Sequence, residues 1–141
     1  MKTIIALYGP SNTGKTNTLN YLIEKMLDST DEVIDRNKRG EDRRVYISYN
    51  NKEIAITTAG DNGDEIKQNI KFFKDREDRD FDILVTATKT KGCTCQILSA
   101  YAEEIKTDIN WIKKNTAKLS IDLINQAQAE DIKSFIDSII G

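Results

Sequence analysis

The residues best suited to chemistry in this chain form one short segment near its beginning. The spacing G-x-x-x-x-G-K-[ST] is matched without a gap by Gly9, Pro10, Ser11, Asn12, Thr13, Gly14, Lys15 and Thr16. In a loop with this spacing, backbone N–H groups turn inward around phosphate oxygens, the lysine reaches the outer phosphates and the last hydroxyl ligates magnesium. The two glycines permit backbone angles and a close approach that a side chain would block. The segment therefore predicts a pocket for the phosphates of a nucleotide.

The sequence on both sides supplies the strand and the helix that such a loop needs. Residues 3–8 form an apolar run typical of a buried parallel strand. The following residues carry an apolar stripe at helical spacing, made by Leu19, Leu22, Ile23, Met26 and Leu27. The positive end of this helix would face the anion, and we include Thr18 among the expected nucleotide-binding residues. The alternative is an ordinary glycine turn with a solvated Lys15.

The rest of the chain alternates between predicted strands and helices. Residues 28–44 are polar and lack apolar periodicity, so they predict a long mobile loop. An antiparallel hairpin is predicted for residues 45–57, because Asn50 and Asn51 tolerate the backbone angles of a tight turn. Further helices are predicted at residues 64–75, 95–105 and 129–139, and further strands at 81–87 and 108–114.

These elements predict a single α/β domain over residues 1–141. Its expected architecture has three layers around a mainly parallel sheet of about five strands, with one antiparallel edge strand. In open α/β sheets, ligands bind beyond the carboxyl ends of the parallel strands. Gly60, Asp61 and Asp64 follow such an end, whereas Glu53 and Asp82 begin their strands and should lie at the opposite rim.

The charge and the residue composition of the chain limit which kinds of binding partner are expected. Charged residues make up 31% of the chain and the formal net charge is −2, so no global basic field points to nucleic acid. The apolar run at residues 3–8 is too short to cross a membrane and lacks a signal peptide's cleavage region, so we expect a cytoplasmic protein. Cys93 and Cys95 are the only cysteines and histidine is absent. A zinc site of the usual soft ligands is therefore excluded.

The order of these features resembles a P-loop NTPase, and more narrowly the layout of the small GTPase-like branch. There, a phosphate loop, a polar loop and a hairpin are followed by D-x-x-G; here Thr57-Thr58-Ala59-Gly60-Asp61 stands at that place. Roughly the first 90 residues of the chain take part in the likeness. The resemblance implies a three-layer P-loop NTPase fold that binds a nucleoside triphosphate together with Mg²⁺.

Two positions depart from that branch. Thr57 stands where the branch has the aspartate that holds magnesium through water, and a hydroxyl cannot supply the missing negative charge. Asp61 is therefore the first candidate to orient the metal's water shell and to act with Lys15 in catalysis, and Asp64 is the second. The alternative for both acids is a loop that caps the next helix.

The second departure concerns the base. Thr88-Lys89-Thr90-Lys91 stands where the branch has [NT]-K-x-D, and Lys91 has the wrong charge to read guanine. We therefore expect ATP rather than GTP. Gly60 and Lys89 complete the expected nucleotide contacts, with Lys89 laying its stem on the base as in the resembling branch. A surface lysine is the alternative for Lys89.

The leading functional hypothesis is a magnesium-dependent triphosphatase or nucleotide switch whose state a protein partner senses. Because no group obviously orients the attacking water, hydrolysis should be slow or need a partner's residue. A small kinase with an acceptor near Asp35 and Arg36, and a module that binds nucleotide without hydrolysis, remain alternatives. Arg36, Arg39 or Arg43 could act as an in-chain arginine finger, or simply be solvated.

Overall fold

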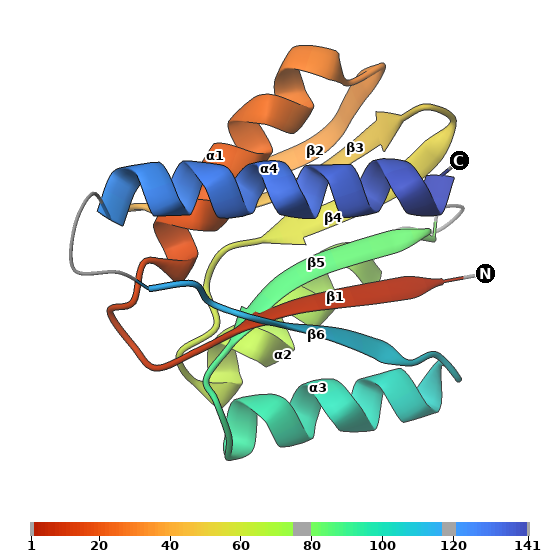
Figure 1. The fold of residues 1–141 in the computed structure, drawn as a ribbon. Helices are drawn as coiled ribbons and strands as arrows, with labels where there is room; N and C mark the ends of the chain where they lie inside the picture. Colours follow the sequence, from red (N-terminus) through yellow and green to blue (C-terminus); the bar gives the residue numbers. More distant parts are fainter. Residues whose placement is uncertain (1, 75–79, 117–120, 141) are drawn as a thin grey trace.

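The computed structural model describes residues 2–74, 80–116 and 121–140 of the chain (Figure 1). In chain order its elements are β1 (Thr3–Tyr8), α1 (Lys15–Ser29), β2 (Glu32–Arg39), β3 (Asp42–Tyr49), β4 (Lys52–Thr57), α2 (Gly63–Lys74), β5 (Ile83–Thr88), α3 (Cys93–Glu104), β6 (Ile109–Lys113) and α4 (Ile121–Ile140). The helices and strands predicted after residue 44 are confirmed, although α4 begins at Ile121, well before the predicted start at residue 129, and the other ends differ by a few residues. Residue 75, the last of one predicted helix, lies outside the described residues.

The six described strands form one mixed sheet in the order β2-β3-β4-β5-β1-β6. Strands β4, β5, β1 and β6 run parallel, whereas β3 is antiparallel to both β2 and β4. The expectation of about five strands with an antiparallel edge strand needs correction. The antiparallel strand β3 lies inside the sheet, and an additional strand, β2, forms the edge.

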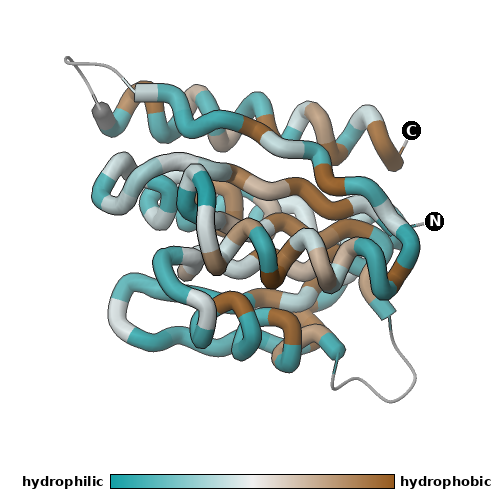
Figure 2. The backbone as a smooth tube through the Cα atoms, turned by 90° about the horizontal axis from the view of Figure 1, so that it is seen from below, coloured by the Kyte–Doolittle hydropathy of each residue, from teal (hydrophilic) through white to brown (hydrophobic). Residues whose placement is uncertain are grey.

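Helices cover both faces of this sheet and make three layers. Helices α1 and α4 pack on one face, and α2 and α3 on the other (Figure 1). Alternate residues of β1 therefore enter different cores: Ile5 and Leu7 pack with α1 and α4, while Ile4 and Ala6 pack on the side of α2 and α3. The hydropathy colouring places hydrophobic positions mainly in the interior (Figure 2). The three-layer α/β architecture is thus confirmed.

The long mobile loop predicted for residues 28–44 is wrong. Residues 32–39 form strand β2, and the next strand begins at Asp42 after a tight turn in which Gly40 has φ 63°. Most β2 side chains are exposed, so the strand shows no apolar alternation. Its backbone pairing with β3 decides the conformation instead, because strand preference depends strongly on tertiary neighbours.

The hairpin predicted for residues 45–57 is confirmed. Strands β3 and β4 are joined at Asn50 and Asn51, whose φ angles are 49° and 65°. Two consecutive positive φ angles are typical of the type I′ turn, which matches the twist of the two strands. The turn sets the register Tyr49↔Lys52, and this register brings the beginning of β3 beside the end of β4.

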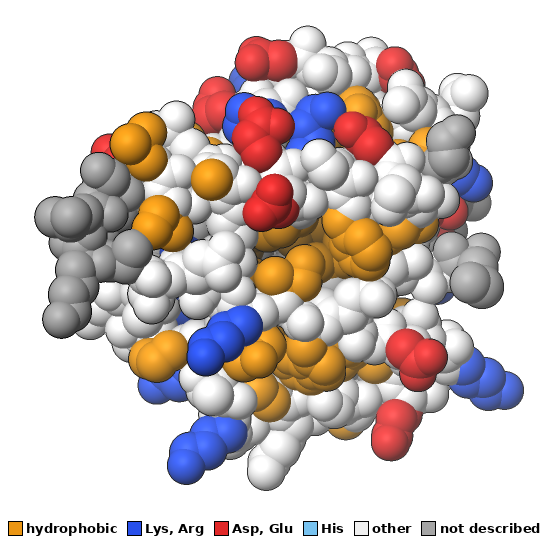
Figure 3. Space-filling model, viewed as in Figure 1, with side chains coloured by type: hydrophobic (Ala, Val, Ile, Leu, Met, Phe, Trp, Pro, Cys, Tyr) orange, Lys and Arg blue, Asp and Glu red, His pale blue; other side chains and the backbone are white. Residues whose placement is uncertain are grey.

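The two edges of the sheet differ in character. The β2 edge carries charged side chains and a register irregularity between Val33 and Asp35, both of which discourage pairing with another chain. The β6 edge is only five residues long, and Trp111 on it is 41% exposed. Hydrophobic atoms are visible on both sides of β6, below α4 and above α3 (Figure 3).

Candidate functional site

The phosphate-loop segment lies where the carboxyl ends of the parallel strands meet. It connects β1 to α1 at the edge of the sheet where β4, β5 and β6 also end (Figure 1). Glu53 and Asp82 lie at the opposite rim, as expected, where each backbone N–H donates to the other residue, at 2.8 Å in both cases. Candidate groups for chemistry are therefore found at the loop end of the sheet.

The loop before α1 has a distinctive backbone conformation. Asn12 and Gly14 adopt positive φ angles of 62° and 91°, and the Thr13 hydroxyl donates to the carbonyl of Pro10 at 2.7 Å. Within the described residues, the backbone N–H groups of residues 14–17 donate no hydrogen bond. Positive-φ residues followed by free N–H groups at a helix start form the kind of concavity that binds phosphate.

The ammonium group of Lys15 lies beneath this loop. Lys15 is only 5% exposed, and its Nζ donates to the carbonyls of Gly9 at 2.6 Å and Thr88 at 2.8 Å. It also contacts Asp61 Oδ1 at 3.3 Å. Gly9 after β1, Thr88 at the end of β5 and Asp61 after β4 thus hold the ammonium group at the end of the sheet.

Burial sets the protonation behaviour of Lys15. Desolvation lowers its pKa below the ordinary value, and the nearby charge of Lys89 lowers it further. The carboxylate of Asp61 partly opposes this by favouring the charged form. A phosphate anion beside Nζ would raise the pKa in the same way as Asp61, so anion binding and protonation of Lys15 are coupled.

The segment after β4 reaches Lys15 by crossing the end of a neighbouring strand. Because β5 lies between β4 and β1, residues 58–61 pass directly over the carboxyl end of β5. A Cβ atom at Gly60 would lie 1.9 Å from the carbonyl oxygen of Ala87. Only glycine allows this approach, and the crossing brings Asp61 to Lys15.

A cavity of about 410 Å³ opens between the phosphate loop and this crossing segment. We call it the phosphate cavity. Its lining includes six residues that the sequence predicted, together with Asn17 from the start of α1; the predicted six are Asn12, Gly14, Lys15, Thr16, Gly60 and Asp61. The structure thus brings the main predicted site residues together.

Asp42, Glu41 and Thr58 also line the phosphate cavity, although sequence reasoning missed them. Asp42 begins the antiparallel strand β3, so it lies at the same rim as the end of β4. Its Oδ1 accepts a hydrogen bond from the Thr58 hydroxyl at 3.4 Å. Gly40 was the available signal, because a glycine between two polar runs indicates a hairpin turn and therefore a strand beginning at Asp42.

The lining offers oxygen ligands suited to magnesium bound together with phosphates. Magnesium prefers one or two carboxylates, phosphate oxygens and retained waters over an all-protein cage. Thr16, Asp61 and Asp42 supply a hydroxyl and two carboxylates around the same cavity. No group of three or more acidic, cysteine or histidine side chains that could hold a metal is present among the described residues. The residues therefore fit a phosphate-bound magnesium rather than one held by protein alone.

Thr57 is turned away from the phosphate cavity. Its side chain is fully buried, and its hydroxyl is hydrogen-bonded to that of Thr86 in β5 at 2.9 Å. This pair links two strands inside the sheet and leaves no role for Thr57 toward a metal.

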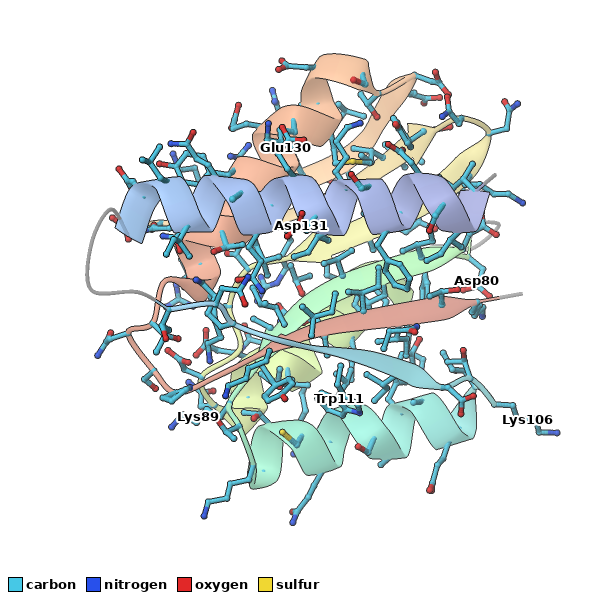
Figure 4. The ribbon with its side chains drawn as sticks, viewed as in Figure 1. Asp80, Lys89, Lys106, Trp111, Glu130 and Asp131 are labelled. Carbon is cyan, nitrogen blue, oxygen red and sulfur yellow. The ribbon has the colours of Figure 1, made fainter. Side chains whose placement is uncertain are left out.

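Within the loop, the predicted residues Gly9, Pro10, Ser11 and Thr13 are not among the residues that line the phosphate cavity. Three predicted site residues from other parts of the chain also lie outside it. Thr18 is fully buried and its hydroxyl donates to Asn125 Oδ1 of α4 at 3.2 Å, so its side chain cannot contact a ligand there. Asp64 lines a neighbouring cavity. Lys89 is exposed at the end of β5, on the same rim as the phosphate loop but not among the cavity's lining residues (Figure 4).

A second buried lysine lies behind the loop. Lys114 is 3% exposed, its Nζ donates to the carbonyl of Asn115, and desolvation lowers its pKa. No ion pair of Lys114 with a carboxylate is present in the part of the chain that the structure describes. Its main chain is nevertheless anchored, because its N–H donates to the Tyr8 carbonyl at 2.8 Å.

Replacing Lys114 with methionine is expected to stabilise the protein by about 1 kcal/mol at neutral pH. The lowered pKa means that burying the charged form of Lys114 in the folded protein costs free energy. This cost is fully present at a pH below the pKa of Lys114 in the folded protein, and it decreases as the pH rises above that pKa. Thermal unfolding of Lys114→Met against pH should show a gain that shrinks under alkaline conditions. The exposed neighbour Lys113, changed to methionine, is the control. A loss of stability at neutral pH would contradict the expectation.

Comparison with protein-family models, with curated proteins and with solved structures finds no match for this chain. In the described part of the chain, every helix falls short of the length or the apolar character of a membrane span. The case for a function therefore depends on the geometry of the phosphate cavity.

Proposed function

We propose that this protein binds a nucleoside triphosphate with Mg²⁺ in the phosphate cavity and hydrolyses it slowly. The observation that carries the proposal is the buried ammonium of Lys15, which lies beneath a loop with free backbone N–H groups and contacts Asp61 at the wall of the cavity. This arrangement supports a P-loop type of site, with ATP as the expected nucleotide. A protein partner that senses the γ-phosphate remains part of the proposal.

Different residues of the cavity would bind the phosphates and the metal. The N–H groups of residues 14–17 and Lys15 would hold the β- and γ-phosphates and neutralise the charge that develops on their oxygens. Thr16 and Asp61, with Asp42 nearby, would hold the metal, which supplies further charge neutralisation when bound. Because Asp61 and Asp42 are assigned to the metal, Glu41 is the one carboxylate of the described lining left to orient the attacking water, and we expect turnover well below the roughly 1–10³ s⁻¹ common among enzymes.

The first experiment measures binding and turnover separately. Calorimetric titration of the full chain with ATP, GTP, ADP and GDP, with and without magnesium, identifies the ligand. Phosphate release over many hours then measures hydrolysis. Magnesium-dependent binding with slow release supports the proposal, while tight binding with intact triphosphate after incubation points to the non-hydrolysing module. If no nucleotide binds, the proposal fails.

Replacing Asp61 with asparagine should distinguish the contribution of the metal to affinity from the contribution of the phosphate contacts. Without magnesium, the change removes a carboxylate that repels the triphosphate, so affinity should rise. With magnesium, it removes a ligand, so the gain in affinity that the metal provides should shrink about tenfold and hydrolysis should fall. Asp64→Asn, in the neighbouring cavity, is the matched control. Equal magnesium dependence in Asp61→Asn and wild type would exclude Asp61 as a metal ligand.

The same variant makes a prediction about pH. Triphosphate binding needs protonated Lys15, so affinity should fall as the pH rises through its lowered pKa. Asp61 raises that pKa, and its removal should therefore move the alkaline fall of affinity to lower pH. Titrations at several pH values without magnesium test this, and a shift in the opposite direction would contradict it.

A second candidate function, transfer of the γ-phosphoryl group to a small acceptor, is favoured by one observation. A cavity of about 610 Å³ shares Asp42 with the phosphate cavity and is lined by Arg39, Arg43 and Arg44. Asp35 and Arg36, the acceptor residues first considered, do not line it. Release of ADP that an added hydroxyl or carboxylate compound accelerates would favour a kinase over a triphosphatase.

A further inference from the structure

Strand β6 leaves one edge of the sheet open to another strand. Among the described strands it pairs with β1 alone. Unlike β2 at the opposite edge, it carries apolar side chains, those of Ile109, Trp111 and Ile112. Hydrophobic atoms follow β6 between α4 and α3 (Figure 3). An accessible edge of this kind is a template on which another strand can extend the sheet.

Alternate residues of β6 turn their backbone groups toward this open edge. The N–H of Lys114, just beyond the strand, donates to the Tyr8 carbonyl of β1 at 2.8 Å. Successive residues of a strand direct their N–H and C=O groups to opposite sides. Counting back from Lys114, the groups of Lys113, Trp111 and Ile109 therefore point away from β1.

Helix α4 closes one end of the edge. The Gln128 side chain donates to the Lys113 carbonyl at 2.7 Å and so occupies the end of the strand. Within the described residues, the N–H and C=O groups of Ile109 and Trp111 remain open, with Asn110 midway between them. An antiparallel second copy would pair Ile109 of each chain with Trp111 of the other, forming about four hydrogen bonds around a twofold axis at Asn110.

The side chains fit this register. Trp111 is 41% exposed, and its ring lies edge-to-face with that of Tyr8, at a centroid distance of 6.2 Å. In the antiparallel register it lies opposite Ile109 of the second copy, and aromatic residues paired with β-branched ones stabilise sheets. The twofold axis produces this contact twice.

The charges at the two ends of β6 favour the same arrangement. Glu103 and Asp108 are exposed near the beginning of the strand, and Lys113 is exposed at its end. Lys106, also near the beginning, projects away from the strand (Figure 4). Antiparallel pairing brings the acidic beginning of one copy beside the basic end of the other. The edge is therefore complementary to itself, as a twofold interface requires.

We propose that two copies of this chain pair antiparallel along β6, around a twofold axis at Asn110, and continue one sheet across the dimer. Because the open segment is short, we expect a dissociation constant of roughly 10–100 µM. Asn110, Trp111 and the other residues of this edge do not line the phosphate cavity, so the dimer does not depend on nucleotide binding.

Sedimentation of the full chain measures the dimer, and fluorescence locates it. The average mass should rise from that of one chain toward that of two between about 1 µM and about 1 mM. Trp111 is the only tryptophan, so its emission should move to shorter wavelength over the same range. Trp111→Lys should stay monomeric. Val33→Lys, at a residue 39% exposed on the opposite edge strand, is the matched control and should dimerise like wild type.

Exchange of charges tests the direction of pairing. Lys113→Glu and Asp108→Lys each bring like charges together twice, so each should weaken dimerisation about fivefold. The double variant restores opposite charges and should return the dissociation constant to within about twofold of wild type. These variants keep Trp111, so its fluorescence remains the readout.

A chain that keeps the mass of one copy at every concentration overturns the proposal. A dimer in which the emission of Trp111 does not move, or that Trp111→Lys forms as readily as wild type, uses another surface and overturns it as well. Should Trp111→Lys fail to fold, the charge variants decide: recovery in the double variant supports the proposal, and its absence overturns it. Nucleotide binding is measured separately, so this proposal and the proposed function can each fail alone.

Discussion

Replacing Gly60 with alanine is expected to lower the thermal midpoint by about 10 °C and to abolish triphosphate binding. The new Cβ would lie 1.9 Å from the Ala87 carbonyl oxygen, and a backbone atom in a buried strand cannot move aside. The segment after β4 must then lift away from β5, at a cost of about 3 kcal/mol. Because the same segment carries Asp61, the Asp61 carboxylate should no longer line the phosphate cavity. Thermal unfolding and calorimetric titration measure the two effects.

Gly63→Ala is the matched control for this variant. Its Cβ would also meet atoms at short distance, 2.7 Å from Cys93 Sγ and 2.9 Å from Ile97 Cδ1, but both belong to side-chain ends that can rotate. We expect it to cost much less than Gly60→Ala and to keep nucleotide binding. If Gly60→Ala unfolds at the wild-type temperature, the segment does not cross β5 as described.

Replacing Lys15 with methionine should produce the largest loss of affinity. A hydrogen bond from a charged group is worth about 1.5–3 kcal/mol, so losing the ammonium should weaken triphosphate binding from about tenfold to more than a hundredfold. The midpoint of the free protein should change little, because the variant removes both the cost of burying a charge and the hydrogen bonds to Gly9 and Thr88. Titration with the preferred triphosphate, and thermal unfolding without ligand, measure both.

The control for charge alone is Lys91→Met, which removes an exposed lysine beyond the end of β5. It should leave affinity nearly unchanged. Similar losses in Lys91→Met and Lys15→Met would mean that phosphate binding depends on the general charge of this rim rather than on the buried ammonium.

The sequence alone determined the local parts of this protein. The spacing of Gly9, Gly14, Lys15 and Thr16 indicated the loop, the apolar run before it indicated β1, and the stripe after it indicated α1. The paired asparagines at 50 and 51 indicated the β3–β4 hairpin. Each of these features depends on residues close together in the chain, whose backbone preferences and periodicity are visible without knowledge of distant contacts.

Only the tertiary structure decided which distant residues meet. The polar residues 32–39 became a strand because β3 pairs with them, and this pairing brought Asp42 into the phosphate cavity. The position of β5 between β4 and β1 made Gly60 necessary, since the segment after β4 must cross a strand end to deliver Asp61. Likewise, α4 placed Ile124 beside the loop. Strand order and helix packing arise from contacts across the whole fold, which no local pattern in the sequence encodes.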